Sequence, residues 1–255
     1  EGYRWPHDVI RLVTIERNRM EPAFKPKITP IDRIQENLVA RVERRALNWL
    51  CARMPRRVSP EMLTAFGMFG ALLVLTGYLG SNLDPNWLWL SIGGYVVHWL
   101  GDSLDGSLAR FRKIERPRFG YFLDHSCDGL ATLLVLAGIG LSPYVELEAA
   151  LVALAGYLLL SIHAFLRVRV LSEMKLSYLA AGPTELRFLL IGFTLAMMAF
   201  GSEGQGWFGR ISGFDIFTAS AGTIMIVLFV HQTLVTARRL AVEEPARNAE
   251  WRGRS

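Results

Sequence analysis

The sequence predicts an all-α integral membrane protein in which six transmembrane helices follow an amphipathic helix at the membrane interface. More than half of its 255 residues are apolar, and long stretches without Asp, Glu, Lys or Arg begin at Met62. A helix needs about 20 mostly apolar residues to cross the hydrocarbon core, and backbone amides in lipid must be hydrogen-bonded within the segment. Six helical spans are therefore expected, at residues 62–83, 85–101, 129–145, 149–166, 188–202 and 216–237.

The distribution of Lys and Arg gives an independent prediction of orientation. From the N-terminal segment to the C-terminal one, the segments outside the spans carry 13, 0, 5, 0, 4, 1 and 5 basic residues. Cytoplasmic loops are richer in Lys and Arg than loops on the other side of the membrane. This alternation therefore predicts that both termini and the loops 110–118 and 167–187 are cytoplasmic.

The region before the first span is predicted to be a polar segment followed by a juxtamembrane amphipathic helix. Within residues 31–57, apolar residues recur every three to five positions with arginines between them. This pattern is typical of a helix lying on an anionic leaflet; a soluble helix packed on its own domain is the alternative. Ser59 and Pro60 then form a helix N-cap signal that opens the first span. The expected organisation is an N-terminal region 1–57, a six-helix membrane domain 58–240 and a cytoplasmic tail 241–255.

Four aspartates stand where the second span ends and the third begins. Asp102 and Asp105 are three residues apart, and Asp124 and Asp128 are four apart, so each pair shares one helix face. The short basic connection makes the two helices antiparallel neighbours, which brings both pairs together near the inner membrane surface. Crowded carboxylates repel one another, and oxygen ligands suit hard cations such as Mg²⁺, Mn²⁺ or Ca²⁺. Two such cations would balance four charges and could clamp a diphosphate; otherwise the acids are simply solvated at helix ends.

The residues that follow each pair suit a phosphorylated nucleotide. Gly106 and Ala109 are small enough to let a nucleotide lie against the backbone, and the planar fork of Arg110 can grip phosphate. Gly120 would let the third span approach the same ligand closely. His98 lies four residues before Asp102 on its helix face and either supports that carboxylate or packs in the bundle. His125 follows Asp124 directly and is therefore expected to point off the face of the aspartates, while Cys51 and Cys127 are expected to be packing thiols.

The run D-x-x-D-G-x-x-A-R, followed after a short loop by G-x-x-x-D-x-x-x-D, resembles the signature of the CDP-alcohol phosphotransferases. It is matched at every fixed position, by Asp102, Asp105, Gly106, Ala109, Arg110, Gly120, Asp124 and Asp128. The resemblance implies that the four aspartates surround two Mg²⁺ or Mn²⁺ ions and that residues 58–240 are catalytic. It further implies that the CDP moiety contacts Gly106, Ala109 and Arg110, with Asp105 and Gly120 beside it. Asp128 would be the general base on an acceptor hydroxyl that attacks the β-phosphorus and releases CMP, in an enzyme that is commonly a homodimer.

Two short runs are similar to the choline/ethanolamine phosphotransferase arm of that family, which transfers from a CDP-aminoalcohol to a lipid hydroxyl. They are Leu123–Asp128, similar to F-D-H-G-C-D, and Gly182-Pro183-Thr184-Glu185, similar to G-P-T-E. The other arm combines CDP-diacylglycerol with a soluble alcohol such as inositol phosphate, glycerol phosphate or serine. An anionic acceptor of that kind would be bound by guanidinium groups. Four arginines lie in predicted cytoplasmic loops: Arg118, Arg167, Arg169 and Arg187. The positive-inside bias is the alternative explanation for them. The first arm is the favoured prediction.

Two other classes of function are alternatives to this enzyme. A divalent-cation transporter also places acids in spans, but it predicts carboxylates near mid-membrane on several helices rather than on two helices near one surface. If the chain were a catalytically silent membrane scaffold, the match to the motif would be a coincidence. The expected partners are a CDP-alcohol, a lipid or soluble alcohol acceptor, the bilayer and a second copy of the chain; no nucleic acid is expected.

Overall fold

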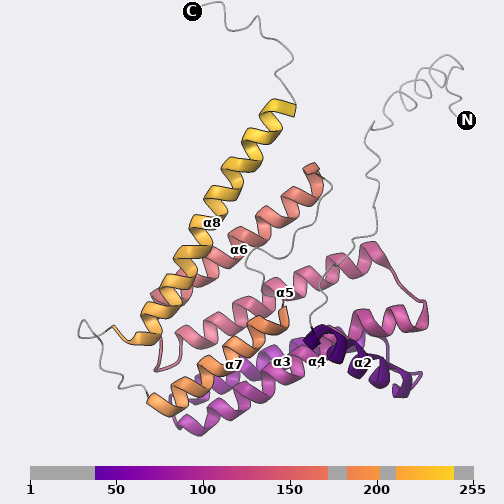
Figure 1. Ribbon diagram of the computed structural model, residues 1–255. Helices are drawn as coiled ribbons and strands as arrows, with labels where there is room; N and C mark the ends of the chain where they lie inside the picture. The colour runs from indigo at the N-terminus through magenta and orange to yellow at the C-terminus, as the bar shows by residue number, and fades with distance from the viewer. Residues whose placement is uncertain (1–37, 172–182, 202–210, 244–255) are drawn as a thin grey trace, which may run out of the picture.

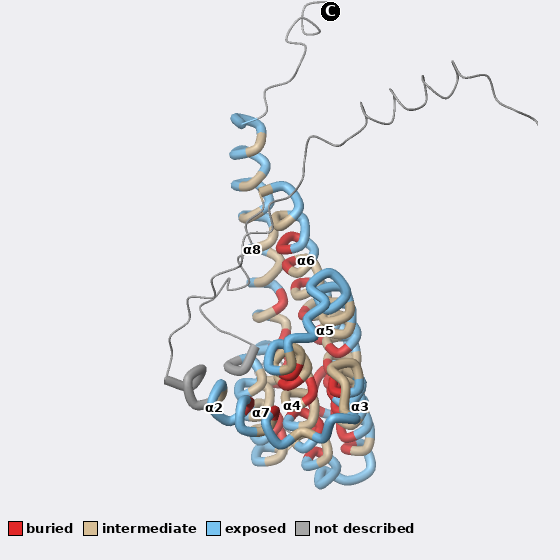
Figure 2. The backbone as a smooth tube through the Cα atoms, turned by 90° about the vertical axis from the view of Figure 1, so that its right-hand side faces the viewer, coloured by how far each residue is buried: buried red, intermediate tan, exposed pale blue. Residues whose placement is uncertain are grey.

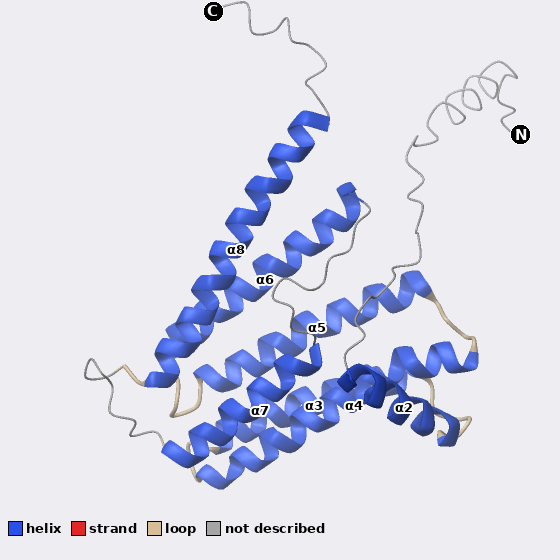
Figure 3. Cartoon of the chain, viewed as in Figure 1, coloured by secondary structure: helices blue, strands red, loops and turns tan. Residues whose placement is uncertain are grey.

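The computed structural model describes residues 38–171, 183–201 and 211–243, and these residues are almost entirely helical, without a strand among them (Figures 1 and 3). The predicted fold class is thereby confirmed at the level of an all-helical chain. The elements are α2 (Leu38–Arg53), α3 (Pro60–Gly80), the 3-10 turn η1 (Pro85–Trp87), α4 (Leu88–Arg112), α5 (Pro117–Gly140), α6 (Leu147–Leu171), α7 (Pro183–Phe200) and α8 (Gly213–Glu243).

Within the described residues, four helices are long and apolar enough to cross a membrane: α3, α5, α6 and α8. The two other predicted spans fall in α4, whose second half is polar, and in α7, which has a shorter apolar stretch at Leu186–Phe200. Six spans therefore stay a prediction. The helices also run further than expected, because α4 continues to Arg112 and α5 begins at Pro117, so only four residues join them where a nine-residue loop was predicted.

Helices α3 and α4 pack backbone against backbone, and this contact positions the first pair of aspartates. A Cβ atom added to Gly101 would stand 2.3 Å from the backbone nitrogen of Gly67, and one added to Gly70 would stand 2.3 Å from the backbone nitrogen of His98. Small residues on both helices permit this approach, as they do at many membrane helix interfaces. Figure 2 shows buried residues gathered where these helices meet their neighbours.

Helix α2 is tied to the ends of α3 and α4. Leu47 and Cys51 pack with Leu63, Leu104 and Leu108 in a small buried cluster. The Arg112 guanidinium donates hydrogen bonds to three backbone oxygens around the end of α2, those of Met54 (3.1 Å), Pro55 (2.8 Å) and Val58 (2.5 Å). Ser59 then caps α3 as predicted, its Oγ accepting from the Met62 backbone N–H at 3.2 Å. The interfacial position of α2 stays a prediction, and residues 31–37 lie outside the described part.

Candidate functional site

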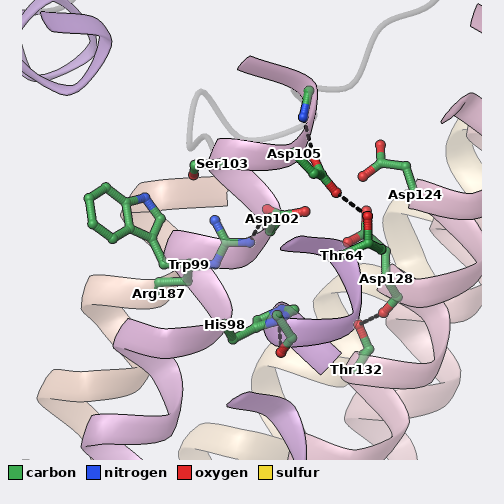
Figure 4. A network of polar contacts seen from close by, with 12 residues as sticks. Thr64, His98, Trp99, Asp102, Ser103, Asp105, Asp124, Asp128, Thr132 and Arg187 are labelled. Carbon is green, nitrogen blue, oxygen red and sulfur yellow. Dashed lines mark hydrogen bonds and ion pairs between the residues drawn. The ribbon is translucent and has the colours of Figure 1, made fainter. Parts of the chain in front are cut away.

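All four predicted aspartates line one small cavity between α3, α4 and α5 (Figure 4). Asp102 and Asp105 come from the polar half of α4, and Asp124 and Asp128 from the second and third turns of α5. The prediction that the two pairs come together is confirmed by this cavity. Its complete lining is Thr64, Gly67, Met68, His98, Asp102, Asp105, Asp124, Cys127 and Asp128.

The chain itself holds the two aspartates of α4 in place. The Thr64 hydroxyl donates to Asp105 Oδ2 at 2.6 Å, and the Gly106 backbone N–H donates to Asp105 Oδ1. Arg187 of α7 forms an ion pair with Asp102 Oδ2, and the two side chains are only 13% and 25% exposed. Hydrogen bonds from a charged donor in such partly buried surroundings are among the stronger ones. Both carboxylates are therefore oriented before any ligand enters.

The two aspartates of α5 are less constrained. Asp124 Oδ2 lies 3.1 Å from Nδ1 of His125, whose ring packs between Tyr121 and Phe165 with centroids 4.2 and 5.1 Å away. The carboxylate of Asp128 has no hydrogen-bond partner among the described residues, although its backbone oxygen accepts from the Thr132 hydroxyl at 2.8 Å. Within the described part of the chain, neither carboxylate oxygen of Asp128 is therefore taken by another side chain.

The expectation that His125 points off the face of the aspartates was wrong. One potential ligand atom each from Asp124, His125 and Asp128 lies within 4.8 Å of the others. The long imidazole turns back along α5 because Tyr121, one turn earlier, and Phe165 of α6 offer aromatic faces on that side. Sequence spacing alone fixes where a Cβ points and not where the ring ends.

The electrostatics of the cavity favour the binding of hard cations. Four carboxylates line it, and the guanidinium of Arg187, which pairs with Asp102, balances a single negative charge. Crowded carboxylates of this kind are stabilised by cations that neutralise them. Oxygen ligands are those that Mg²⁺, Mn²⁺ and Ca²⁺ prefer, so the donor set present fits such ions.

The residues predicted to hold a nucleotide lie beside this cavity on α4 and at the start of α5. A Cβ on Gly106 would meet the Arg110 guanidinium at 3.2 Å, so the side chain of Arg110 runs alongside Gly106. Arg110 also donates to the Ser107 hydroxyl at 3.3 Å, and it stands exposed with Ala109 half-buried before it. Gly120 is exposed, with open space where a Cβ would stand. The space at Gly120 is therefore open, and the atoms nearest a Cβ at Gly106 belong to the flexible Arg110 side chain.

The arginines predicted for an anionic acceptor divide into two groups. None of the four arginines lines the cavity itself, but Arg187 forms an ion pair with Asp102, which does. Gly182 lies outside the described residues, and Pro183, Thr184 and Glu185 belong to α7 without described side chains. Three residues of the G-P-T-E run therefore belong to the helix that carries Arg187.

Sequence reasoning missed the contribution of α3 to the site. Thr64, Gly67 and Met68 all line the cavity, and His98 both lines it and places Nδ1 3.0 Å from the Gly67 carbonyl oxygen. The available signal was the series of small residues on α3 and α4, which indicates two helices in close contact. That contact would have brought a hydroxyl of the first span next to the aspartates of the second.

Comparison with known proteins gives consistent matches. A family model described as CDP-alcohol phosphatidyltransferase matches residues 57–232. Cholinephosphotransferase 1 of Danio rerio is 31% identical over 97 residues, covering 36% of this chain and 25% of the relative. An uncharacterized CDP-alcohol phosphatidyltransferase class-I family protein of Dictyostelium discoideum is 24% identical over 190 residues, covering 72% of this chain and 48% of the relative.

A third relative bears a different name. CDP-diacylglycerol–serine O-phosphatidyltransferase of Encephalitozoon cuniculi is 34% identical over 107 residues, covering 38% of this chain and 28% of the relative. The chain thus spans between about a quarter and a half of the length of these curated relatives.

Proposed function

The chain belongs to the CDP-alcohol phosphatidyltransferase family, and on that premise we propose that it transfers a substituted phosphate group from a CDP-alcohol to an acceptor hydroxyl and releases CMP. The observation that carries the proposal is the convergence of Asp102, Asp105, Asp124 and Asp128 on one cavity. The family match makes phospholipid synthesis in a membrane the setting, and the Lys/Arg alternation supports a cytoplasmic active site. Residues 58–240 would form the catalytic domain, in a chain that acts as a homodimer.

The four aspartates would hold two Mg²⁺ or Mn²⁺ ions. Bound there, the ions polarise the diphosphate and stabilise the departing CMP. Thr64 and Arg187 hold the carboxylates of Asp105 and Asp102 in fixed orientations, so these two ligands need not reorganise when the substrate enters. The exposed side chain of Arg110 would contact phosphate, and the nucleotide would lie against Gly106, Ala109 and Gly120.

Asp128 would act as the general base. An alcohol gives up its proton only with difficulty, so a positioned base is needed as the hydroxyl attacks the β-phosphorus. Of the four carboxylates, those of Asp102, Asp105 and Asp124 already have side-chain partners in the described part of the chain, and that of Asp128 has none. The oxygen best able to accept a hydrogen bond from an incoming hydroxyl is therefore on Asp128.

We propose a CDP-aminoalcohol such as CDP-choline or CDP-ethanolamine as the donor and a lipid hydroxyl as the acceptor. The Leu123–Asp128 run and the similarity to a cholinephosphotransferase support this choice. The second candidate is CDP-diacylglycerol with a soluble alcohol. It is favoured by the similarity to a serine phosphatidyltransferase and by the guanidinium of Arg187 at the cavity, which could meet an anionic acceptor.

The test is CMP release by the purified chain over a matrix of CDP donors and lipid or soluble alcohols, with Mg²⁺ or Mn²⁺ present. Activity should disappear on chelation and return when either ion is added. Asp128→Asn should reduce turnover by at least about 10²-fold, in line with the loss of a general base. Asp84→Asn is the matched control, because Asp84 caps η1 outside the cavity and Asn caps helices equally well.

Each rival has its own outcome in this assay. If CMP forms from CDP-diacylglycerol and never from CDP-choline or CDP-ethanolamine, the donor is CDP-diacylglycerol and the preferred assignment is wrong. An unchanged turnover in Asp128→Asn would remove the base assignment. Cation flux through reconstituted vesicles, with no CMP from any donor, would replace the enzyme by a transporter.

A further inference from the structure

An apolar groove of about 840 Å³, including its open part, runs between α3 and α5 on the outside of the bundle. These two helices pack directly against each other (Figure 1). Three residues, Thr64, Met68 and Cys127, line both this groove and the cavity of the four aspartates. These three residues therefore border the groove on one side and the candidate active site on the other. The groove lining is Glu61, Thr64, Ala65, Met68, Phe69, Leu72, Phe119, Leu123 and Cys127.

The groove follows one face of each helix. Its α5 residues stand four apart, and its α3 residues recur at spacings of three and four from Glu61 to Leu72, which is the period of one helix face. Eleven residues advance roughly 16 Å along a helix. That is about half of the ~30 Å hydrocarbon thickness of a bilayer, which is the depth occupied by the chains of one leaflet.

The two ends of the groove differ in polarity. At one end Glu61 forms an ion pair with Arg116, which joins the start of α3 to the loop before α5. The Arg116 guanidinium also lies 4.2 Å from the centre of the Phe119 ring. From Met68 onward the α3 side is apolar, ending at Phe69 and Leu72, which are 53% and 48% exposed. The groove therefore has a charged end and an apolar end, as a lipid does, and between them it borders the cavity of the four aspartates.

We propose that this groove seats an acyl chain of the lipid substrate, with the reacting end of that lipid reaching the four aspartates past Thr64, Met68 and Cys127. The inference rests on the proposed transfer reaction, since it names where that reaction takes its lipid from. The same chain chemistry belongs to a diacylglycerol acceptor and to a CDP-diacylglycerol donor. The groove is assigned to the diacylglycerol acceptor, which is the lipid of the proposed reaction, and specific labelling by the CDP-diacylglycerol probe alone would overturn that assignment.

The first experiment measures the binding of the lipid in the absence of turnover. The protein, in phosphatidylcholine nanodiscs without divalent ions, is irradiated with diacylglycerol or CDP-diacylglycerol that carries a diazirine in its acyl chain, and labelled peptides are mapped by mass spectrometry. Label is expected on Phe69, Leu72 and Leu123, and an excess of the same unlabelled lipid should remove it. The probe whose label is removed by its own unlabelled lipid identifies the lipid that occupies the groove. Label that lands on other helices, or that added phosphatidylcholine removes equally well, would overturn the proposal.

The second experiment fills the groove. Ala65 is exposed and lines it, so Ala65→Trp places a large ring where the chain would lie. Ala155→Trp makes the same substitution at an exposed position of α6 outside the groove. In the Ala65 variant, KM for a long-chain lipid substrate should rise at least tenfold, whereas kcat/KM for its dibutyryl analogue and KM for the soluble substrate should stay unchanged. The Ala155 variant should match the wild type throughout.

The outcomes of this experiment are distinct from a failure of the proposed reaction. Wild-type protein that releases no CMP from any donor would end the proposed function itself. Wild-type activity together with an unchanged long-chain KM in Ala65→Trp would end the groove assignment alone. An equal loss for long-chain and dibutyryl substrates at an unaltered melting temperature would also overturn it, because the ring would then be acting on the reacting groups.

Discussion

The close crossing of α3 and α4 makes Gly101→Ala the most informative single substitution. The new methyl carbon would lie 2.3 and 2.4 Å from the backbone nitrogen and Cα of Gly67 and 2.6 Å from the Leu63 carbonyl oxygen. Backbone atoms cannot rotate away, so the helices must separate by about 1 Å to restore normal contact distances. Overpacking of this kind costs typically about 1–3 kcal/mol. Because Asp102 follows directly, the separation also moves the first carboxylate relative to those on α5, and a 1 Å displacement can cost about 10²-fold in rate.

Gly93→Ala is the matched control, since it makes the same change in the same helix. Nothing lies within 4 Å of a Cβ at Gly93, and exchanging glycine for alanine inside a helix gains up to about 1 kcal/mol. Thermal unfolding in detergent and CMP release at saturating Mg²⁺ should therefore separate the two variants. Gly101→Ala should melt earlier and turn over about 10²-fold more slowly, and Gly93→Ala should do neither. Equal melting temperatures and equal rates would refute the close backbone contact between the helices.

Three further substitutions probe the contacts that hold the bundle and the site. Arg112→Gln removes charged hydrogen bonds to three backbone oxygens near the end of α2 and should lower the free energy of unfolding by about 2 kcal/mol; faster proteolytic cleavage of α2 would show it. Asp215→Ala leaves two backbone N–H donors, those of Glu146 and Ser212, without their acceptor and should destabilise by a similar amount. CMP release per folded molecule, measured after correction by calorimetry, should remain unchanged in that variant. Arg187→Gln removes the positive charge paired with Asp102 and should tighten Mn²⁺ binding several-fold in a titration followed by electron paramagnetic resonance.

Hydropathy predicted the helices well because a bilayer imposes a length on any apolar run. The first predicted span, 62–83, corresponds to α3, and its N-cap at Ser59 is confirmed by the hydrogen bond to Met62. The end of α4 was predicted less well. Charged residues end a hydrophobic run without ending a helix, and Arg110 and Arg112 are good helix formers that also suit the negative end of the helix dipole. The helix therefore continued into the predicted loop and shortened the connection to α5.

The site was predictable where it depended on spacing within one helix, and not where it depended on contacts between helices. The spacing of the aspartates gave both pairs, and the short connection brought them together. The bond from Thr64 to Asp105 spans 41 positions and that from Arg187 to Asp102 spans 85. Such contacts are set by how the helices cross and rotate, which for α3 and α4 depends on close packing by glycines on both helices. Arg187 was therefore identified as a charge near the site but not as the partner of one ligand.

The partners of the four aspartates explain why the site is built on two unequal helices. On α4, Thr64 and Arg187 fix carboxylates that are held by a rigid, glycine-lined crossing with α3. On α5, Asp124 is paired only with a neighbouring imidazole, and the carboxylate of Asp128 has no partner among the described residues. A ligand that must stay fixed gains from preorganised partners, whereas a base that takes a proton must keep an oxygen free for the substrate. The same helix also contributes Leu123 and Cys127 to the groove between α3 and α5. The less constrained helix is thus the one that borders both the reacting hydroxyl and the proposed path of the lipid.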